Sequence, residues 1–122
     1  MQGSCHKTLL DSRFRQLIMT LMSYRVLIKA GVSIERLKRP VRRILNKLVH
    51  IYAKRGYDLI ITSTYEGTHS PSSLHYSNEA IDVDDPPEDK QAITAEIKDS
   101  LGKDFDVILE SDHIHIEYDP KG

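Results

Sequence analysis

The chain has 122 residues, and 17 Lys and Arg stand against 18 Asp and Glu, so its net charge at pH 7 is −1. This length predicts one domain, and the charge balance argues against a non-specific nucleic-acid binder, which needs a basic excess. The single cysteine, Cys5, excludes an internal disulfide and is expected to be an inert thiol. No apolar stretch is long enough to span a bilayer, and residues 1–10 lack the pattern of a signal peptide. We therefore expect no membrane partner and a protein that is cytoplasmic on synthesis.

Two helical patterns and one ambiguous stretch make up the first half of the chain. Apolar residues recur at helical spacing over 8–24, which predicts an amphipathic helix. Val26–Ile28 fits either a short strand or the end of a helix. Pro40 suits the first turn of a second helix, and Gly56 marks its end. The apolar stripe of that helix comprises Val41, Ile44, Leu45, Leu48, Ile51 and Tyr52. Its solvated face is expected to carry Arg42, Arg43 and Lys47.

Strand and turn signals alternate in the second half. Residues 57–63 are apolar and β-branched, which predicts a buried strand, and residues 79–83 predict a second short strand. Between them, residues 65–77 are rich in Gly, Ser, Thr and Pro and are expected to form a loop. A proline pair at 86–87 is expected to open a third helix, which ends at Gly102.

The last two strands are predicted over 105–109 and 113–118, and their short connection implies an antiparallel hairpin. Because helices come first and strands mostly later, we expect the α+β class, with a small antiparallel sheet and flanking helices. The whole chain, 1–122, is expected to be a single domain. Within it, residues 1–56 are expected to be mainly helical, and residues 57–120 to carry the sheet and a metal site.

Alternation along the predicted strands gathers metal-binding groups on one side of the sheet. In the last strand, His113, His115 and Glu117 share a face, and the isoleucines between them point the other way. In the second strand, Asp82 also points away from its apolar neighbours, and His75 lies in the loop just before that strand. Two imidazoles and one carboxylate form a common catalytic zinc set that leaves a fourth position for water. These residues therefore predict a zinc site.

A catalytic zinc site also needs a carboxylate that takes the proton of the attacking water. Asp112, three residues before His115 at the end of the hairpin, is the first candidate for this base, and Glu110 is the second. The alternative interpretation of such histidines is an exposed side chain without a ligand. We assign His6 and His50 to surface or helix packing on that basis.

The motif carried by the loop and the two strands resembles a known group. Residues 73–82 read SLHYSNEAID, and residues 113–115 read HIH. This pair resembles the zinc D-Ala-D-Ala peptidase family, which includes bacterial D,D-carboxypeptidases, D,D-dipeptidases and phage endolysins. Residues 69–76, together with the Glu-Ser pair at 110–111, are also similar to the amino-terminal signalling domain of hedgehog proteins. The likeness covers residues 57–120 and implies the fold that these two groups share.

The resemblance implies roles for five residues. It implies zinc bound by His75, Asp82 and His115. It implies Asp112 as the catalytic base, because many family members have an acidic residue three positions before the last ligand. It also implies that His113 stabilises the oxyanion or orients the substrate.

The resemblance extends to the rim of the site, with two departures. It implies that Ser73 contacts the substrate peptide and that His69 lies at the rim. Asn78 stands where many members have glycine, and Asn is the non-glycine residue that best tolerates a positive φ. Glu66 stands where active peptidases commonly carry an Arg that binds substrate.

The first functional hypothesis is a zinc metallopeptidase of the carboxypeptidase or endopeptidase type. It would hydrolyse an amide bond in peptidoglycan peptides, D-Ala-D-Ala or a related linkage, and reach the cell wall by lysis or on a phage particle. The alternative, which Glu66 favours, is a catalytically inactive, zinc-containing module that binds a peptide or protein. A zinc-free structural protein of a virion is the third hypothesis.

Overall fold

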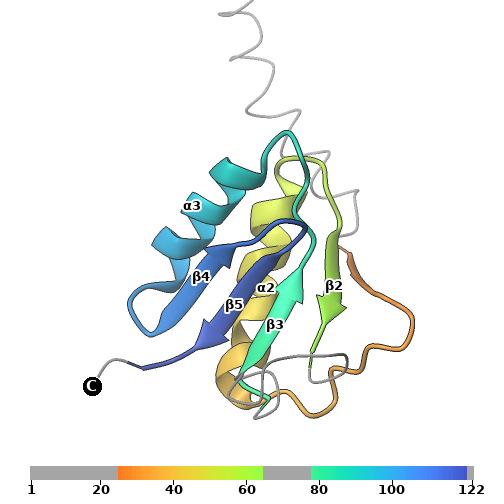
Figure 1. The fold of residues 1–122 in the computed structure, drawn as a ribbon, viewed down its shortest axis with the longest axis vertical. Coiled ribbons are helices and arrows are strands. Elements are labelled where there is room, and N and C mark those ends of the chain that lie inside the picture. The colour runs from red at the N-terminus through yellow and green to blue at the C-terminus, as the bar shows by residue number, and fades with distance from the viewer. Residues whose placement is uncertain (1–24, 65–77, 121–122) are drawn as a thin grey trace, which may run out of the picture.

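The computed structural model describes residues 25–64 and 78–120, which form a five-stranded sheet and two helices (Figure 1). The elements in chain order are β1 (Val26–Ile28), α2 (Arg39–Ala53), β2 (Leu59–Ser63), β3 (Ala80–Val83), α3 (Lys90–Leu101), β4 (Phe105–Leu109) and β5 (Ile114–Tyr118). The strands lie in the order β1-β2-β3-β5-β4, which makes β3 and β5 central neighbours. The predicted helix over 8–24 and the predicted loop over 65–77 lie outside the described residues.

The sheet is mixed, so the α+β class is confirmed but the expectation of an antiparallel sheet is wrong. β1 pairs with β2 in parallel, while β2–β3, β3–β5 and β4–β5 are antiparallel. The parallel pair arises because α2 connects β1 to β2 and returns the chain to the same end of the sheet. The ambiguous stretch Val26–Ile28 is therefore a strand, whose partner is more than 30 residues away in the sequence.

The apolar stripe of α2 faces the sheet as predicted. Pro40 lies in the first turn, where its missing N–H removes no hydrogen bond of the helix. Lys54 caps the carboxyl end, and Gly56 follows with φ of +85°, which agrees with the predicted stop. The buried side chains of the helix are Val41, Ile44, Leu48, Val49, Ile51 and Tyr52.

The third predicted helix begins later than its proline pair indicates. α3 starts at Lys90, after the N-cap residue Asp89. The Asp89 N–H donates to the Pro86 carbonyl over 3.0 Å, so the prolines form a turn before the helix. Gly102 ends the helix with φ of +78°, as expected.

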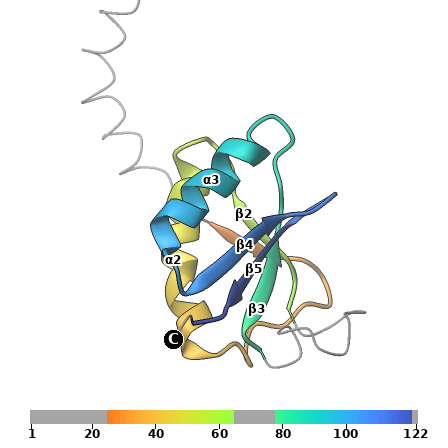
Figure 2. The same ribbon diagram turned by 60° about the vertical axis from the view of Figure 1, so that its left-hand side comes forward.

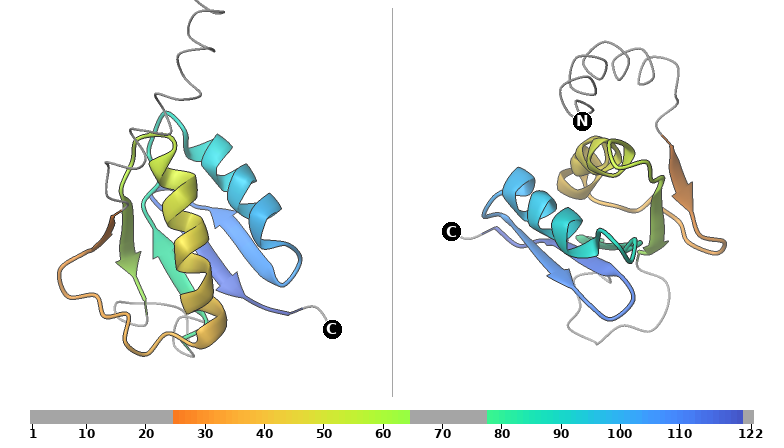
Figure 3. Two further views of the ribbon diagram at one scale, coloured as in Figure 1. Left: turned by 180° about the vertical axis from the view of Figure 1, so that it is seen from behind. Right: turned by 90° about the horizontal axis from the view of Figure 1, so that it is seen from above.

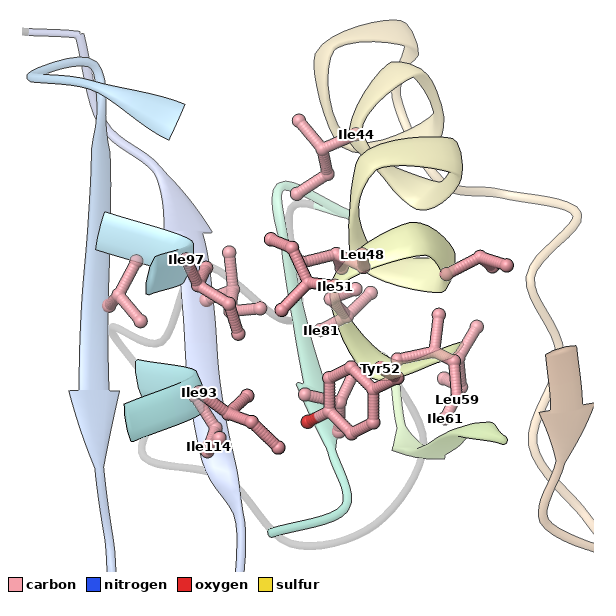
Figure 4. Packing of buried hydrophobic residues seen from close by; sticks show 14 of the residues in the cluster. Ile44, Leu48, Ile51, Tyr52, Leu59, Ile61, Ile81, Ile93, Ile97 and Ile114 are labelled. Carbon is pink, nitrogen blue, oxygen red and sulfur yellow. The ribbon is translucent and has the colours of Figure 1, made fainter. Parts of the chain in front are cut away.

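Both helices cover the same face of the sheet (Figures 2 and 3). The core lies between them and the strands, where Leu48 of α2 and Ile97 of α3 pack with Ile81 and Ile114 of the central strands (Figure 4). All four of these side chains are fully buried. We call the opposite side of the sheet, turned away from α2 and α3, the open face. The odd-numbered residues of β5 lie on this face, because Ile114 and Ile116 point into the core.

Candidate metal centre

Two of the predicted zinc ligands meet on the open face. Asp82 of β3 and His115 of β5 are directly opposite in the antiparallel register. The Oδ1 atom of Asp82 lies 2.9 Å from Nδ1 of His115. Only 10% of the Asp82 side chain and 13% of the His115 side chain are exposed. The period-2 alternation of the two strands therefore brings a carboxylate and an imidazole into contact in a largely dehydrated position.

A second carboxylate holds the other side of the same ring. The Nε2 atom of His115 lies 2.7 Å from Oε1 of Glu117, two residues further along β5. With Asp82 at Nδ1 and Glu117 at Nε2, the ring orientation of His115 is fixed from both sides. Sequence reasoning placed Glu117 on the correct face but gave it no role. The signal for the contact was the spacing of two residues on one strand.

His113 lies beside this pair and contacts three carboxylates. Its Nε2 atom is 3.1 Å from Oε1 of Glu110 and 3.6 Å from Oδ2 of Asp82. Its Nδ1 atom is 2.7 Å from Oδ1 of Asp112. The two candidate bases therefore contact opposite nitrogens of one ring. Glu110 is on the side of Asp82, and the Asp112 side chain is 85% exposed.

The surrounding carboxylates change the acid–base properties of both imidazoles. Burial lowers the pKa of His115, but the hydrogen bonds to Asp82 and Glu117 outweigh this effect and raise its pKa to about 9. Burial also lowers the pKa of His113, and the hydrogen bond to Asp112 with the charges of Asp82 and Glu110 turns the net shift upward. A cation is therefore favoured at this position, whether it is a proton on a ring or a bound metal ion.

The Asp82–His115 pair fits zinc in chemistry and in spacing. Imidazole nitrogen and carboxylate oxygen are ordinary zinc ligands, and two ligands of a tetrahedral zinc ion lie about 3.4 Å apart. The observed 2.9 Å needs only a small separation of the two donor atoms. The third predicted ligand, His75, lies outside the described residues, as do Ser73 and His69. The structure thus brings Asp82 and His115 together and leaves the third ligand a prediction.

Two further sequence predictions concern residues near the site. Asn78, which precedes β3, has φ of +66°, so the predicted left-handed turn is confirmed. Its carbonyl accepts a hydrogen bond from the Lys38 N–H over 3.0 Å, which ties this turn to the start of α2. Glu66, the other departure from the peptidase pattern, lies outside the described residues. His50 is exposed on α2, in agreement with its assignment to the surface.

An acidic group that sequence reasoning missed lies further along the open face. One carboxylate oxygen from each of Asp106, Glu117 and Asp119 lies within 4.8 Å of the others. Asp106 of β4 is directly opposite Glu117 in the register of the hairpin, so the pairing of the two strands creates the cluster. Its signal in the sequence was weak, because only the exact register places Asp106 beside Glu117.

No protein-family model, curated protein or solved structure matches the chain. Across residues 25–64 and 78–120, no helix is both long and apolar enough to cross a membrane.

Proposed function

We propose that the protein is a zinc metallopeptidase that hydrolyses an amide bond in peptidoglycan peptides. The observation that carries the proposal is the contact between Asp82 and His115, which a peptidase of the resembled family would use as zinc ligands. The order of the motif along the chain and the position of the pair on the sheet face turned away from α2 and α3 support it. We propose equally that the fold is that of the D,D-peptidase and hedgehog group, and that His75 completes the ligand set.

The surroundings of His115 support a ligand role for its Nδ1 atom. Glu117 accepts the Nε2–H hydrogen bond and so holds the ring with Nδ1 turned to Asp82. Carboxylates in this outer position orient metal-binding histidines and raise their basicity. Zinc, when bound here, would lower the pKa of a coordinated water and polarise a substrate carbonyl.

The chain itself would supply proton transfer and orientation. Asp112 is proposed as the base, because the resemblance places an acidic residue at its position and its exposed carboxylate is accessible to substrate. Its contact with Nδ1 of His113 would orient that ring. The Nε2–H of the ring, which lies 3.1 Å from Glu110 in the free protein, would then donate to a developing oxyanion in place of Glu110. Glu110 contacts the opposite nitrogen of His113 and is the second candidate for the base.

Zinc content and peptide cleavage test the proposal together. Protein purified without added metal should contain one zinc per chain and should cleave at least one peptide from a panel. The panel offers D-Ala-D-Ala, L,D- and L-Ala-D-Glu linkages. A chelator should remove both properties, and added zinc should restore them. His115→Ala should lose the metal, whereas the exposed His50→Ala serves as the matched control and should keep it.

Two results would contradict the proposal. A zinc content near zero, which added zinc does not restore, would show that the protein has no zinc site. Stable zinc binding without cleavage of any peptide in the panel would refute the proposed peptidase activity. That second result would support the alternative of a zinc-containing binding module, which Glu66 favours because it puts an anion where active relatives carry a cation.

A further inference from the structure

Among the described residues, the strand β1 is an apolar edge of the sheet with exposed side chains. Its three residues Val26, Leu27 and Ile28 are 38%, 41% and 42% exposed, and together with Ile108 they are the exposed large hydrophobic residues of the described chain. β1 has β2 as its only strand neighbour among the described residues and forms the outer strand of the sheet (Figure 3). Three consecutive exposed apolar residues on an edge strand differ from the scattered single residues of an ordinary surface.

The backbone of this edge carries hydrogen-bonding groups that point away from β2. The Arg25 carbonyl accepts from the Leu59 N–H over 3.1 Å, and the Lys29 N–H donates to the Ile61 carbonyl over 3.0 Å. Because backbone groups alternate in direction along a strand, those of Val26 and Ile28 point outward. Within the described residues, neither has a backbone partner on that side. An added strand would therefore find two donors and two acceptors at this edge.

The charges at the two ends of β1 disfavour a second copy as the added strand. Antiparallel pairing centred on Leu27 would put Arg25 opposite Lys29 of the other copy, and parallel pairing in register would put each residue opposite itself. Like charges directly opposite are destabilising in both arrangements. Arg25 already donates to Asp58 through two nitrogens, at 3.1 and 2.7 Å. No described carboxylate pairs with Lys29, so Lys29 would contribute most of the attraction to an acidic strand.

We propose that β1 is a docking edge for an extended segment of another protein in which an apolar core is flanked by acidic residues. The segment adds to the sheet as a strand beside β1. Its backbone pairs with Val26 and Ile28, its apolar side chains cover the exposed residues of β1, and its carboxylates meet Lys29 and Arg25. This docking edge lies on the outer strand, whereas the candidate metal centre lies on the central strands β3 and β5, so the two proposals are independent.

Titration of the isotopically labelled full chain with capped heptapeptides tests the proposal by NMR. The probe is Asp-Asp-Ile-Val-Ile-Asp-Asp, and the comparison peptide has Lys in place of each Asp. The Asp peptide should shift the amide signals of Val26–Ile28 and of β2. It should bind about 3-fold or more tightly than the Lys peptide, because each opposite-charge pair across two strands contributes a modest stabilisation. A version with N-methylated core amides should not bind.

Three variants separate strand addition from non-specific apolar contact. Ile28→Pro removes one outward N–H and no hydrogen bond to β2, and it should abolish binding. Lys29→Glu should weaken the binding of the Asp peptide and strengthen the binding of the Lys peptide by similar factors. Ile108→Ala, at the opposite edge strand, is the control and should change nothing. If Ile28→Pro does not fold, Lys29→Glu decides the outcome.

Any one of the following results would overturn the proposal. Equal affinity for the Asp and Lys peptides would show that charge does not determine binding. Amide shifts that map away from β1, or no shifts with either peptide, would show that β1 is not the binding site. In the free protein, the Val26 and Ile28 amides could instead contact a second copy or residues 1–24. Either contact would show that this edge is already paired and does not bind another protein.

Discussion

Asp82 and His115 face each other across the two central strands, with 2.9 Å between Oδ1 and Nδ1, on the side of the sheet that the described helices leave uncovered. Glu117 holds the same imidazole from its other nitrogen at 2.7 Å. Two carboxylates beside a ring with little exposure to solvent strongly stabilise a positive charge on that ring. The metal-free site therefore has a charge preference that can be measured without knowledge of the substrate.

The stability of the metal-free protein should fall as the pH rises. The pKa of His115 in the folded chain is about 9, above the 6.5 of an ordinary histidine. The protonated ring thus stabilises the fold fully below about pH 6.5, and this contribution is lost as the pH rises through 9. We expect chelator-treated protein to lose on the order of 3 kcal/mol of unfolding free energy between pH 6 and 9.5. Urea denaturation at both values measures the loss.

His115→Gln is the control for this pH dependence. The variant lacks the titrating group and should show a clearly smaller difference between the two pH values. The remainder comes in part from His113, whose pKa is also raised. An equal pH dependence in the variant and the wild type would show that His115 is not the group responsible.

Replacement of the two candidate bases should separate their roles. Asp112→Asn keeps the shape of the side chain and leaves Asp82 and His115 unchanged. If the protein is the proposed zinc peptidase, hydrolysis should fall by roughly 10²–10⁴, the usual contribution of general acid–base catalysis, while the zinc content stays constant. Glu110→Gln should lose much less. A larger loss for Glu110→Gln would assign the base to the carboxylate on the Asp82 side of His113 and would refute our assignment alone.

Local sequence patterns predicted the parts of the fold that depend on local periodicity. The alternation of apolar and polar residues over 113–118 correctly separated the buried Ile114 from His115 on the open face. The apolar stripe of α2 and the antiparallel hairpin β4–β5 were predicted for the same reason. In each case the information lies within a few residues along the chain.

Features that depend on long-range pairing were not predictable from such patterns. Nothing within Val26–Ile28 indicates that its partner is β2 or that the pair is parallel. The group formed by Asp106, Glu117 and Asp119 likewise depends on the register of two strands. At the candidate metal centre, the shared face of Asp82 and His115 was predicted, but the contact with Glu117 depends on the rotamers of both side chains.

Arg42 should contribute more to stability than its exposed position indicates. It was expected to be only part of the solvated face of α2, but its guanidinium donates to the carbonyls of Ile34, Glu35 and Leu37 at 2.6 to 3.0 Å. Arg42→Lys keeps the charge but cannot reach three carbonyls at once. We expect a loss of about 1–2 kcal/mol in chemical denaturation. Arg43→Lys, on the same exposed face, should change stability by less than about 0.5 kcal/mol.

Asn78 should tolerate glycine but not a β-branched residue. Its φ of +66° lies in the left-handed region, where Asn and Gly are the favoured residues. Asn78→Gly should leave the unfolding free energy within about 0.5 kcal/mol of the wild type, whereas Asn78→Val should cost about 1–2 kcal/mol. Thermal melts of the two variants measure the difference. Equal melting temperatures would show that the turn before β3 relaxes without cost.

The ion pairs between α2 and α3 should make a small contribution that disappears in acid. Glu96 of α3 pairs with both Lys54 and Arg55 at the end of α2. The hydrogen bond from Lys54, assisted by Arg55 against the opposing effect of burial, lowers the pKa of Glu96 below its usual 4.5. The stabilisation is therefore present above about pH 4.5 and is lost as the pH falls through the lowered value.

Because all three side chains are partly exposed, Glu96→Gln should cost no more than about 1 kcal/mol at pH 7. The variant and the wild type should converge in urea denaturation near pH 3. A cost at pH 7 that persists unchanged in acid would mean that packing of the Glu96 side chain, and not its charge, joins the two helices.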